Sequence, residues 1–190
     1  MSDFLSTPAN LPIPPDDGAA DHLVGMTMPN IALTATNGET FNVAKAAKLL
    51  VLYCYPMTGR PEVPLPEGWD QIPGARGCTP QSCSYRDHYQ ELKALSAEVA
   101  GLSVQNTAYQ QEMVARLHLP FPVLSDAEYK LQQALNLPTF TTSGMILLKR
   151  LTMVVRHGII EAIHYPVFPS DSDAAWIIDY LSSHSDHQRI

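Results

Sequence analysis

The chain has 190 residues, of which 45% are hydrophobic and 16% charged, which suits one folded domain with a buried core. Its formal net charge of -7 argues against a nucleic-acid partner, because phosphate binding needs clustered Lys and Arg side chains. The longest strongly apolar run, Leu49 to Met57, is far too short to cross a bilayer, so no membrane partner is expected.

The first 24 residues form a proline-rich segment. They contain four prolines and the sequence Asp16-Asp17-Gly18. No Lys or Arg precedes Lys45, and no apolar segment of the signal-peptide kind is present, so we expect a cytoplasmic location. We predict an arm over residues 1–24, either disordered or draped over the protein, and a single folded domain over 25–190.

Two patterns predict the first strands of a sheet. Residues 31–34 and 40–42 flank an Asn37-Gly38 turn, which is typical of a β-hairpin. The continuous apolar run of residues 49–55 has the length of a strand, and such a run suits a central strand buried on both faces.

The stretch 57–77 breaks the regular pattern. It holds four prolines and four glycines, so neither a helix nor a strand can run through it. A loop of this length is uncommon within one domain and is often functional. We therefore predict an inserted loop over about 57–77.

The remaining chain alternates between helix and strand patterns. We expect helices over 81–99, 107–118 and 127–135 and from residue 170 or 171 onward, together with strands over 102–105 and 121–124 and a hairpin of 146–155 with 159–165. This order predicts an α/β fold with a mixed central β-sheet flanked by helices.

Two cysteines stand where the long loop gives way to a helix. Thr79 and Pro80 are typical of a first helical turn, which places Cys78 at or just before the helix N-terminus. Unpaired N–H groups and the helix dipole at that end favour a negative charge, so Cys78 is a candidate for a reactive thiolate. Cys83 follows five residues later on the same helix.

The spacing of these cysteines narrows the chemistry. The close Cys-x-x-Cys spacing of zinc sites and of thioredoxin-type redox pairs is absent, so we expect no metal. Two interpretations remain: Cys78 is reactive and Cys83 supplies a second thiol, or both cysteines are inert. On an intact helix their Cα atoms would be about 8–9 Å apart. A disulfide needs less than about 7 Å, so the helix would have to unwind before the two sulfurs bonded.

Three sequence segments together resemble the peroxiredoxins, and among them the bacterioferritin-comigratory or PrxQ type. These segments are residues 51–56 (VLYCYP), 77–87 (GCTPQSCSYRD) and 121–126 (FPVLSD), and the similarity spans about residues 25–183. The resemblance implies a thioredoxin-like fold and reduction of hydrogen peroxide and organic hydroperoxides without a cofactor. It implies Cys78 as the peroxidatic cysteine and Cys83 as the resolving cysteine of an intramolecular disulfide. It also implies a thioredoxin- or glutaredoxin-like reductant and a monomer or homodimer.

The resemblance assigns two further site residues. Arg150 matches the family's arginine from a later strand, which would hold the thiolate and polarise the leaving oxygen. The family's Pro-x-x-x-Thr-x-x-Cys motif is broken here, because Ala75 stands three residues before Cys78. Thr58, just after Pro56, is the candidate to supply the missing hydroxyl if the extra residues are inserted after it.

Other functions stay open at this point. A non-catalytic sensor or binding domain on the same fold would explain the broken motif and the long loop. A thiol–disulfide reductase is disfavoured because Cys-x-x-Cys is absent. Cys54 lies within the apolar strand and is expected in the core, and Arg86 is expected to form surface ion pairs.

Overall fold

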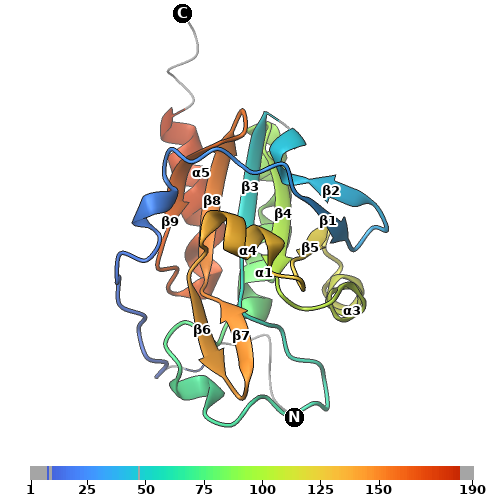
Figure 1. Ribbon diagram of the computed structural model, residues 1–190, viewed down its shortest axis with the longest axis vertical. Coiled ribbons are helices and arrows are strands. Elements are labelled where there is room, and N and C mark those ends of the chain that lie inside the picture. Colours follow the sequence, from blue (N-terminus) through green and yellow to red (C-terminus); the bar gives the residue numbers. More distant parts are fainter. Residues whose placement is uncertain (1–7, 9, 47, 185–190) are drawn as a thin grey trace, which may run out of the picture.

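The computed structural model describes residues 8, 10–46 and 48–184, and its centre is a seven-stranded sheet (Figure 1). The strand order is β2-β1-β5-β4-β3-β8-β9. Strands β3, β4 and β5 run parallel, and the other neighbours run antiparallel. The strands are β1 (Ala32–Ala35), β2 (Thr40–Asn42), β3 (Leu49–Cys54), β4 (Glu98–Ser103), β5 (Val123–Ser125), β8 (Leu151–Arg156) and β9 (Ile159–His164). The predicted mixed α/β sheet and the N-terminal hairpin are confirmed.

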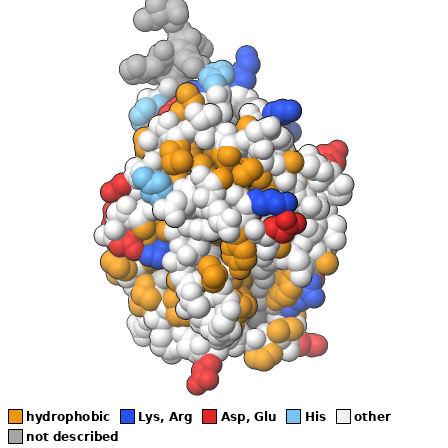
Figure 2. All heavy atoms as spheres, in the orientation of Figure 1, with side chains coloured by type: hydrophobic (Ala, Val, Ile, Leu, Met, Phe, Trp, Pro, Cys, Tyr) orange, Lys and Arg blue, Asp and Glu red, His pale blue; other side chains and the backbone are white. Residues whose placement is uncertain are grey.

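Helices cover both faces of this sheet. The α-helices are α1 (Cys78–Asp87), α2 (Tyr89–Ala94), α3 (Thr107–Leu117), α4 (Lys130–Leu135) and α5 (Asp173–His184). The 3₁₀ turns are η1 (Asp21–Leu23), η2 (Val43–Lys45), η3 (Trp69–Gln71) and η4 (Ser170–Ser172). Among the described residues, no helix combines the length and the apolar character needed to cross a membrane. On the face seen in Figure 2, Lys and Arg side chains are scattered and do not gather into one basic patch.

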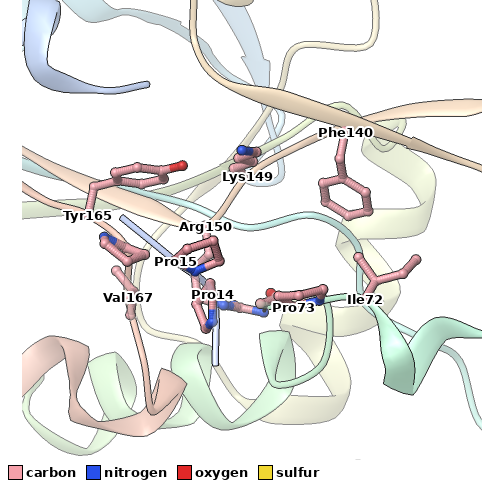
Figure 3. A pocket seen from close by; sticks show the side chains of 11 residues that line it. Pro14, Pro15, Ile72, Pro73, Phe140, Lys149, Arg150, Tyr165 and Val167 are labelled. Carbon is pink, nitrogen blue, oxygen red and sulfur yellow. Dashed lines mark hydrogen bonds between the residues drawn. The ribbon is translucent and has the colours of Figure 1, made fainter. Parts of the chain in front are cut away.

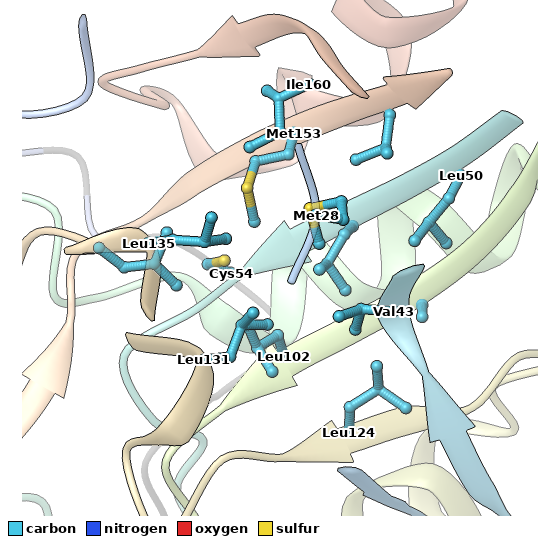
Figure 4. Close-up of a cluster of buried hydrophobic side chains, with 14 of the residues drawn as sticks. Met28, Val43, Leu50, Cys54, Leu102, Leu124, Leu131, Leu135, Met153 and Ile160 are labelled. Carbon is cyan, nitrogen blue, oxygen red and sulfur yellow. The ribbon is translucent and has the colours of Figure 1, made fainter. Parts of the chain in front are cut away.

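Strand β3 joins two hydrophobic cores, one on each face of the sheet. Its side chains alternate, so that Leu50, Leu52 and Cys54 pack in one core and Val51 and Tyr53 in the other. This arrangement explains why the run is continuously apolar. Cys54 is fully buried among aliphatic side chains, as predicted (Figure 4). Burial raises the pKa of its thiol, so this cysteine stays protonated and inert.

Two parts of the predicted element pattern are wrong. The helix expected to reach residue 99 ends at Ala94, because Ser96 turns the chain with a φ of 61° and the apolar residues from Val99 onward are buried in β4. The strand expected over 146–155 is divided between β7 (Met145–Leu148) and β8. Strand β7 pairs with β6 (Thr139–Thr142), which was not predicted, in a separate two-stranded sheet. Arg150 lies in the short break between β7 and β8.

The loop over 57–77 packs on this small sheet. It contains η3 and no strand or α-helix, as its prolines and glycines predict. Trp69 is 3% exposed and lies 6.2 Å from Phe140 of β6, measured between ring centroids. Trp69 therefore anchors its own loop and brings residues 74–77 to the start of α1.

The described part of the arm, from residue 10 onward, is draped over the domain. Figure 1 shows it running past β6 and along β9. Lys149 Nζ lies 2.5 Å from a carboxylate oxygen of Asp17, and the Tyr165 hydroxyl donates to the other oxygen at 2.6 Å. Residues 1–7 and 9 of the predicted arm lie outside the described residues.

These contacts predict an unusual titration of Asp17. The hydrogen bonds from Lys149 and Tyr165 lower the pKa of Asp17 from 3.8 to about 2. The pKa of Asp17 is lower in the folded state than in the unfolded state. The contact therefore stabilises the arm above pH 4, and this stabilisation is lost as the pH falls toward 2. We expect the carboxyl carbon of Asp17 to titrate by NMR near pH 2, and at a higher pH in Lys149→Met, where the hydrogen bond from Tyr165 still lowers the pKa. A wild-type midpoint near 4 would contradict the contact.

Candidate active site

The first turn of α1 holds Cys78, the candidate reactive cysteine. Gly77 precedes the helix with a φ of 108°, which favours glycine, and its carbonyl accepts the first helical hydrogen bond, from Gln81 N. A Cβ at this position would lie 2.2 Å from Ser170 Oγ, so the site also lacks room for any other residue. Cys78 is the first residue of α1 and is 4% exposed. The helix start predicted at Cys78 is confirmed.

Arg150 lies against the sulfur of this cysteine. Its Nη2 is 3.2 Å from Cys78 Sγ and also donates to the carbonyls of Gly74, Ala75 and Arg76, each at 3.2 Å. The side chain is 3% exposed, and its hydrogen-bond partners in the described part of the chain include no carboxylate. A buried guanidinium without a carboxylate partner is free to stabilise a thiolate and the charge that develops on a leaving oxygen.

A chain of buried hydrogen bonds positions Arg150 and was not foreseen from the sequence. Gln81, one turn after Cys78, accepts from Arg150 Nη1 at 2.5 Å and donates to Asp173 Oδ2 at 2.7 Å. Asp173 is fully buried at the start of α5 and also bonds Thr152 and His164, each at 2.7 Å. His164 is therefore linked to the site through its bond to Asp173. Only the placement of Gln81 one turn after Cys78 was visible in the sequence.

Asp173 should therefore contribute strongly to stability. Replacing it with Ala leaves the buried polar groups of Gln81 and Thr152, and the partly buried ring of His164, without their shared acceptor. We expect Asp173→Ala to lower the free energy of unfolding by about 3 kcal/mol in urea titrations. Asp179→Ala, an exposed carboxylate on the same helix, is the control and should change it by less than about 0.5 kcal/mol. Equal stability of the two variants would contradict this role.

The second cysteine lies on the same intact helix. Cys83 is half-buried, and Cys78 and Cys83 are both free thiols. Burial raises the pKa of the Cys83 thiol, an effect that the nearby Arg86 opposes. With both residues inside α1, helical rise and radius keep their Cα atoms about 8–9 Å apart. A bond between them requires local unwinding of α1.

Thr58 is not joined to this site in the structure. Its hydroxyl donates to Gln105 Oε1 at 3.3 Å, and Gln105 Nε2 donates back to the Thr58 carbonyl at 3.1 Å. Among the described residues, Cys78 Sγ has hydrogen bonds to Arg150 and to the Ala75 carbonyl at 3.6 Å. The role that the resemblance implies for the Thr58 hydroxyl at the sulfur is therefore not tested by these contacts, which favour a structural role instead. Ala75, at the motif position, contributes its carbonyl.

Arg86 has the surface role that was expected. It pairs with Asp87 at 2.8 Å and donates to the Leu117 carbonyl at 2.9 Å. These contacts tie the end of α1 to the end of α3 and leave Arg150 as the cation bonded to Cys78.

A thiol at a helix N-terminus beside a buried arginine, on a mixed sheet of this order, is typical of thiol-dependent redox proteins. The Redoxin family model matches residues 23–178, so the chain belongs to the Redoxin family. The predicted similarity to peroxiredoxins of the Q type is confirmed by its relatives. Chloroplastic peroxiredoxin Q of Triticum aestivum is 29% identical over 74% of this chain and 58% of its own length. That of Gentiana triflora is 25% identical over 95% of this chain and 78% of its own length.

The chain is shorter than several of these relatives, since it spans 58% of the wheat protein and 66% of the two rice proteins that it matches. Two solved structures show the same fold. The peroxidoxin BcpB of Mycobacterium tuberculosis has a TM-score of 0.69 at 21% identity, covering 85% of this chain and 97% of that one. The bacterioferritin comigratory protein of Xanthomonas campestris, described for alkyl peroxide reduction, has a TM-score of 0.66 at 17% identity, covering 93% and 99%.

Proposed function

We propose that this protein is a thiol-dependent peroxidase that reduces hydrogen peroxide and organic hydroperoxides at Cys78. The observation that supports this most is the 3.2 Å contact between Arg150 Nη2 and Cys78 Sγ at the N-terminus of α1. The helix end and the guanidinium both favour the thiolate, which is the nucleophilic form of the residue. The alkyl peroxide activity described for the Xanthomonas protein supports the same substrate class.

In the first step the Cys78 thiolate attacks the terminal oxygen of the hydroperoxide. An S–O bond forms as the O–O bond breaks, and the leaving oxygen takes a proton to give an alcohol, or water from hydrogen peroxide. The sulfur is oxidised to a sulfenic acid and the peroxide is reduced. Arg150 lies where it can stabilise the charge on both oxygens during this exchange.

In the second step Cys83 condenses with the sulfenic acid, which forms the disulfide and releases water. Helix α1 must unwind for this step. The hydrogen bonds that join α1 to its neighbours must break as it unwinds. Ser84 Oγ donates to the Asp171 carbonyl at 2.7 Å, Gln81 is held by Asp173, and Ser82 accepts from Tyr53 at 3.1 Å. Once α1 opens, Cys83 also leaves the surroundings that raise the pKa of its thiol.

A dithiol of the thioredoxin or glutaredoxin kind then reduces the disulfide by thiol exchange and restores both thiols. Such a donor as the partner of this chain, and a monomer or homodimer as its assembly, belong to the proposal. A cytoplasmic location also stays a prediction, since the plant relatives named above are chloroplastic proteins.

A coupled assay tests the function. Peroxide consumption is followed with thioredoxin, thioredoxin reductase and NADPH, and mass spectrometry after one equivalent of peroxide identifies the disulfide. We expect turnover and a Cys78–Cys83 bond, both absent in Cys78→Ser. A folded protein that consumes no peroxide with any dithiol donor would instead favour a non-catalytic sensor.

Thr58→Val tests the hydroxyl that the broken motif leaves in question. In this structure the hydroxyl is bonded to Gln105, so its loss should cost stability and not reactivity. We expect a decrease of about 1 kcal/mol in the free energy of unfolding and less than about a threefold change in peroxide rate. A tenfold slower reaction with unchanged stability would instead place Thr58 at the sulfur.

A further inference from the structure

A cavity of about 190 Å³ lies directly beside the active-site arginine (Figure 3). Its walls are mostly apolar and come from the arm, the 57–77 loop, β6 and the segment after β9. The apolar residues that shape it are Pro14, Pro15, Ile72, Pro73, Phe140 and Val167. An apolar cavity of about 150 Å³ is known to hold benzene, so a phenyl or branched alkyl group fits a space of this size.

Arg150 links the cavity to the sulfur of Cys78. This side chain lines the cavity, and its Nη2 lies 3.2 Å from Cys78 Sγ. Its Nε is buried and has no hydrogen-bond partner among the described residues. A buried donor without a partner is costly, and a ligand oxygen would satisfy it only after the side chain moves, because the atom is closed to solvent in this structure.

The charges around the cavity favour an uncharged ligand. Lys149 also lines it, but its ammonium is paired with Asp17 at 2.5 Å. The guanidinium of Arg150 faces the Cys78 sulfur and three backbone carbonyls. Both cations therefore already have partners in this chain, so the cavity offers no unpaired charge for the carboxylate of an acidic ligand.

One wall belongs to the N-terminal arm, which precedes the 23–178 segment matched by the Redoxin family. Pro14 lies against Gly74, where an added Cβ would be 3.5 Å from the proline ring. Asp17 fixes the arm three residues further on, through Lys149 and Tyr165. The shape of this cavity therefore depends on a polar contact that lies outside the sulfur site.

We propose that this cavity binds the organic part of a compact, uncharged hydroperoxide, with its peroxide oxygens toward Arg150 and Cys78. Asp17 sets the preference for such substrates, because it holds Pro14 and Pro15 in the wall. The inference rests on the proposed peroxidase function and adds to it a binding site and a residue that determines specificity. The bonds that form and break are those of the first step above, with an aryl or branched alkyl alcohol as the leaving product.

The test compares two peroxides in the full-length protein. We expect Asp17→Asn to lower kcat/KM for cumene hydroperoxide about fivefold to tenfold, mainly through KM, and to leave that for hydrogen peroxide within about twofold. Asp16→Asn makes the same charge change in the same exposed turn, and its amide oxygen can still accept from Gly18 N. This control should change neither value. An equal loss for both peroxides, or no loss in Asp17→Asn, would overturn the proposal.

A binding measurement separates this inference from the peroxidase function itself. Trp69 packs against Phe140 in the cavity wall, so its fluorescence should report an occupied cavity. In Cys78→Ser carrying Trp176→Phe, we expect cumyl alcohol to change this fluorescence saturably, and more weakly when Asp17→Asn is added. The measurement needs no turnover. Absence of binding would overturn the cavity proposal, whereas a wild-type protein inactive with both peroxides would overturn the function.

A different observation points to a further residue at the sulfur site. Ser170, in η4, is 4% exposed, and its hydroxyl has no hydrogen-bond partner among the described residues. The position of a Cβ at Gly77 lies 2.2 Å from Ser170 Oγ and 4.0 Å from Arg150 Nη2. This hydroxyl thus lies beside the first turn of α1, on the side where Arg150 approaches.

We infer that Ser170 binds a peroxide oxygen during the attack by Cys78, as a catalytic residue. The hydroxyl can both donate and accept, which suits a hydroperoxide. Because it is closed to solvent beside Gly77, η4 must shift before a peroxide oxygen completes its hydrogen bonding. This second inference also rests on the proposed function.

Ser170→Ala tests this role, because a purely structural hydroxyl would give the opposite pattern. We expect the peroxide rate constant to fall about tenfold or more, with an unfolding midpoint that is equal or higher because no hydrogen bond is lost. Iodoacetamide should alkylate Cys78 at the same rate in Ser170→Ala as in the wild-type protein. Ser172→Ala, which removes a 2.8 Å bond to the Pro169 carbonyl in the same turn, is the control and should keep the peroxide rate. An unchanged peroxide rate in Ser170→Ala, or an equal loss of alkylation, would overturn the inference.

Discussion

Replacing Arg150 with Met should slow the reaction of the protein with peroxide by about 10²- to 10³-fold, because one preorganised donor at the reacting atoms is removed. The guanidinium contacts Cys78 Sγ at 3.2 Å and is buried, so water does not replace its charge once it is lost. The second-order rate constant from stopped-flow fluorescence measures the effect. Arg150→Lys keeps the charge without the planar fork and should give an intermediate rate.

The control for this prediction lies on the strand that follows Arg150. Arg156 ends β8 and pairs with Glu161 of β9, away from the hydrogen bonds of Cys78. Arg156→Met should keep the peroxide rate within about twofold. Circular dichroism confirms that the variants are folded, which matters because Arg150 also holds the carbonyls of Gly74, Ala75 and Arg76. A folded Arg150→Met variant with the wild-type rate would remove Arg150 from the mechanism.

Replacing Cys83 with Ser should separate the two chemical steps. Cys78 lies five residues away with its own contacts to Arg150, so the first equivalent of peroxide should react at nearly the wild-type rate. Turnover with thioredoxin should fall by at least about 100-fold, because no disulfide forms for the donor to reduce. Excess peroxide should then carry Cys78 to the sulfinic acid, seen in intact mass as a gain of two oxygen atoms.

Cys54→Ala is the matched control for Cys83→Ser. Cys54 is fully buried in the core that lies across β3 from α1, and burial raises the pKa of its thiol. It should keep the disulfide and the turnover, with a moderate loss of stability from the change in packing. Sustained thioredoxin-dependent turnover in Cys83→Ser would show that a thiol other than Cys83 resolves the sulfenic acid.

The helix at the centre of the site was predictable because its start is encoded locally. Gly77 adopts a positive φ, Pro80 suits a first turn, and the thiol of Cys78 lies between them. The unwinding that a disulfide requires also follows from spacing alone. The sequence also predicted the buried strand β3 and the irregular loop over 57–77. A continuous apolar run and a cluster of prolines each allow few other kinds of secondary structure.

The position of Arg150 was predictable only through the resemblance to peroxiredoxins. Residue by residue, the sequence favoured a long strand through it, and the pairing of β7 with β6 breaks that strand. Thr58 shows the converse. Its place before the insertion favoured a role at the sulfur. In the folded chain its hydroxyl instead donates a hydrogen bond to Gln105.

The sequence by itself determined the candidate thiol, the helix that presents it and the spacing that forbids a disulfide while this helix is intact. These features depend on backbone angles and residue spacing within a few turns of the chain. Only the tertiary structure decided what surrounds the sulfur. Arg150 lies 72 residues from Cys78, Asp173 lies 92 from Gln81, and Lys149 lies 132 from Asp17. Such contacts depend on how the loop, the arm and α5 pack together, and no local pattern encodes that packing.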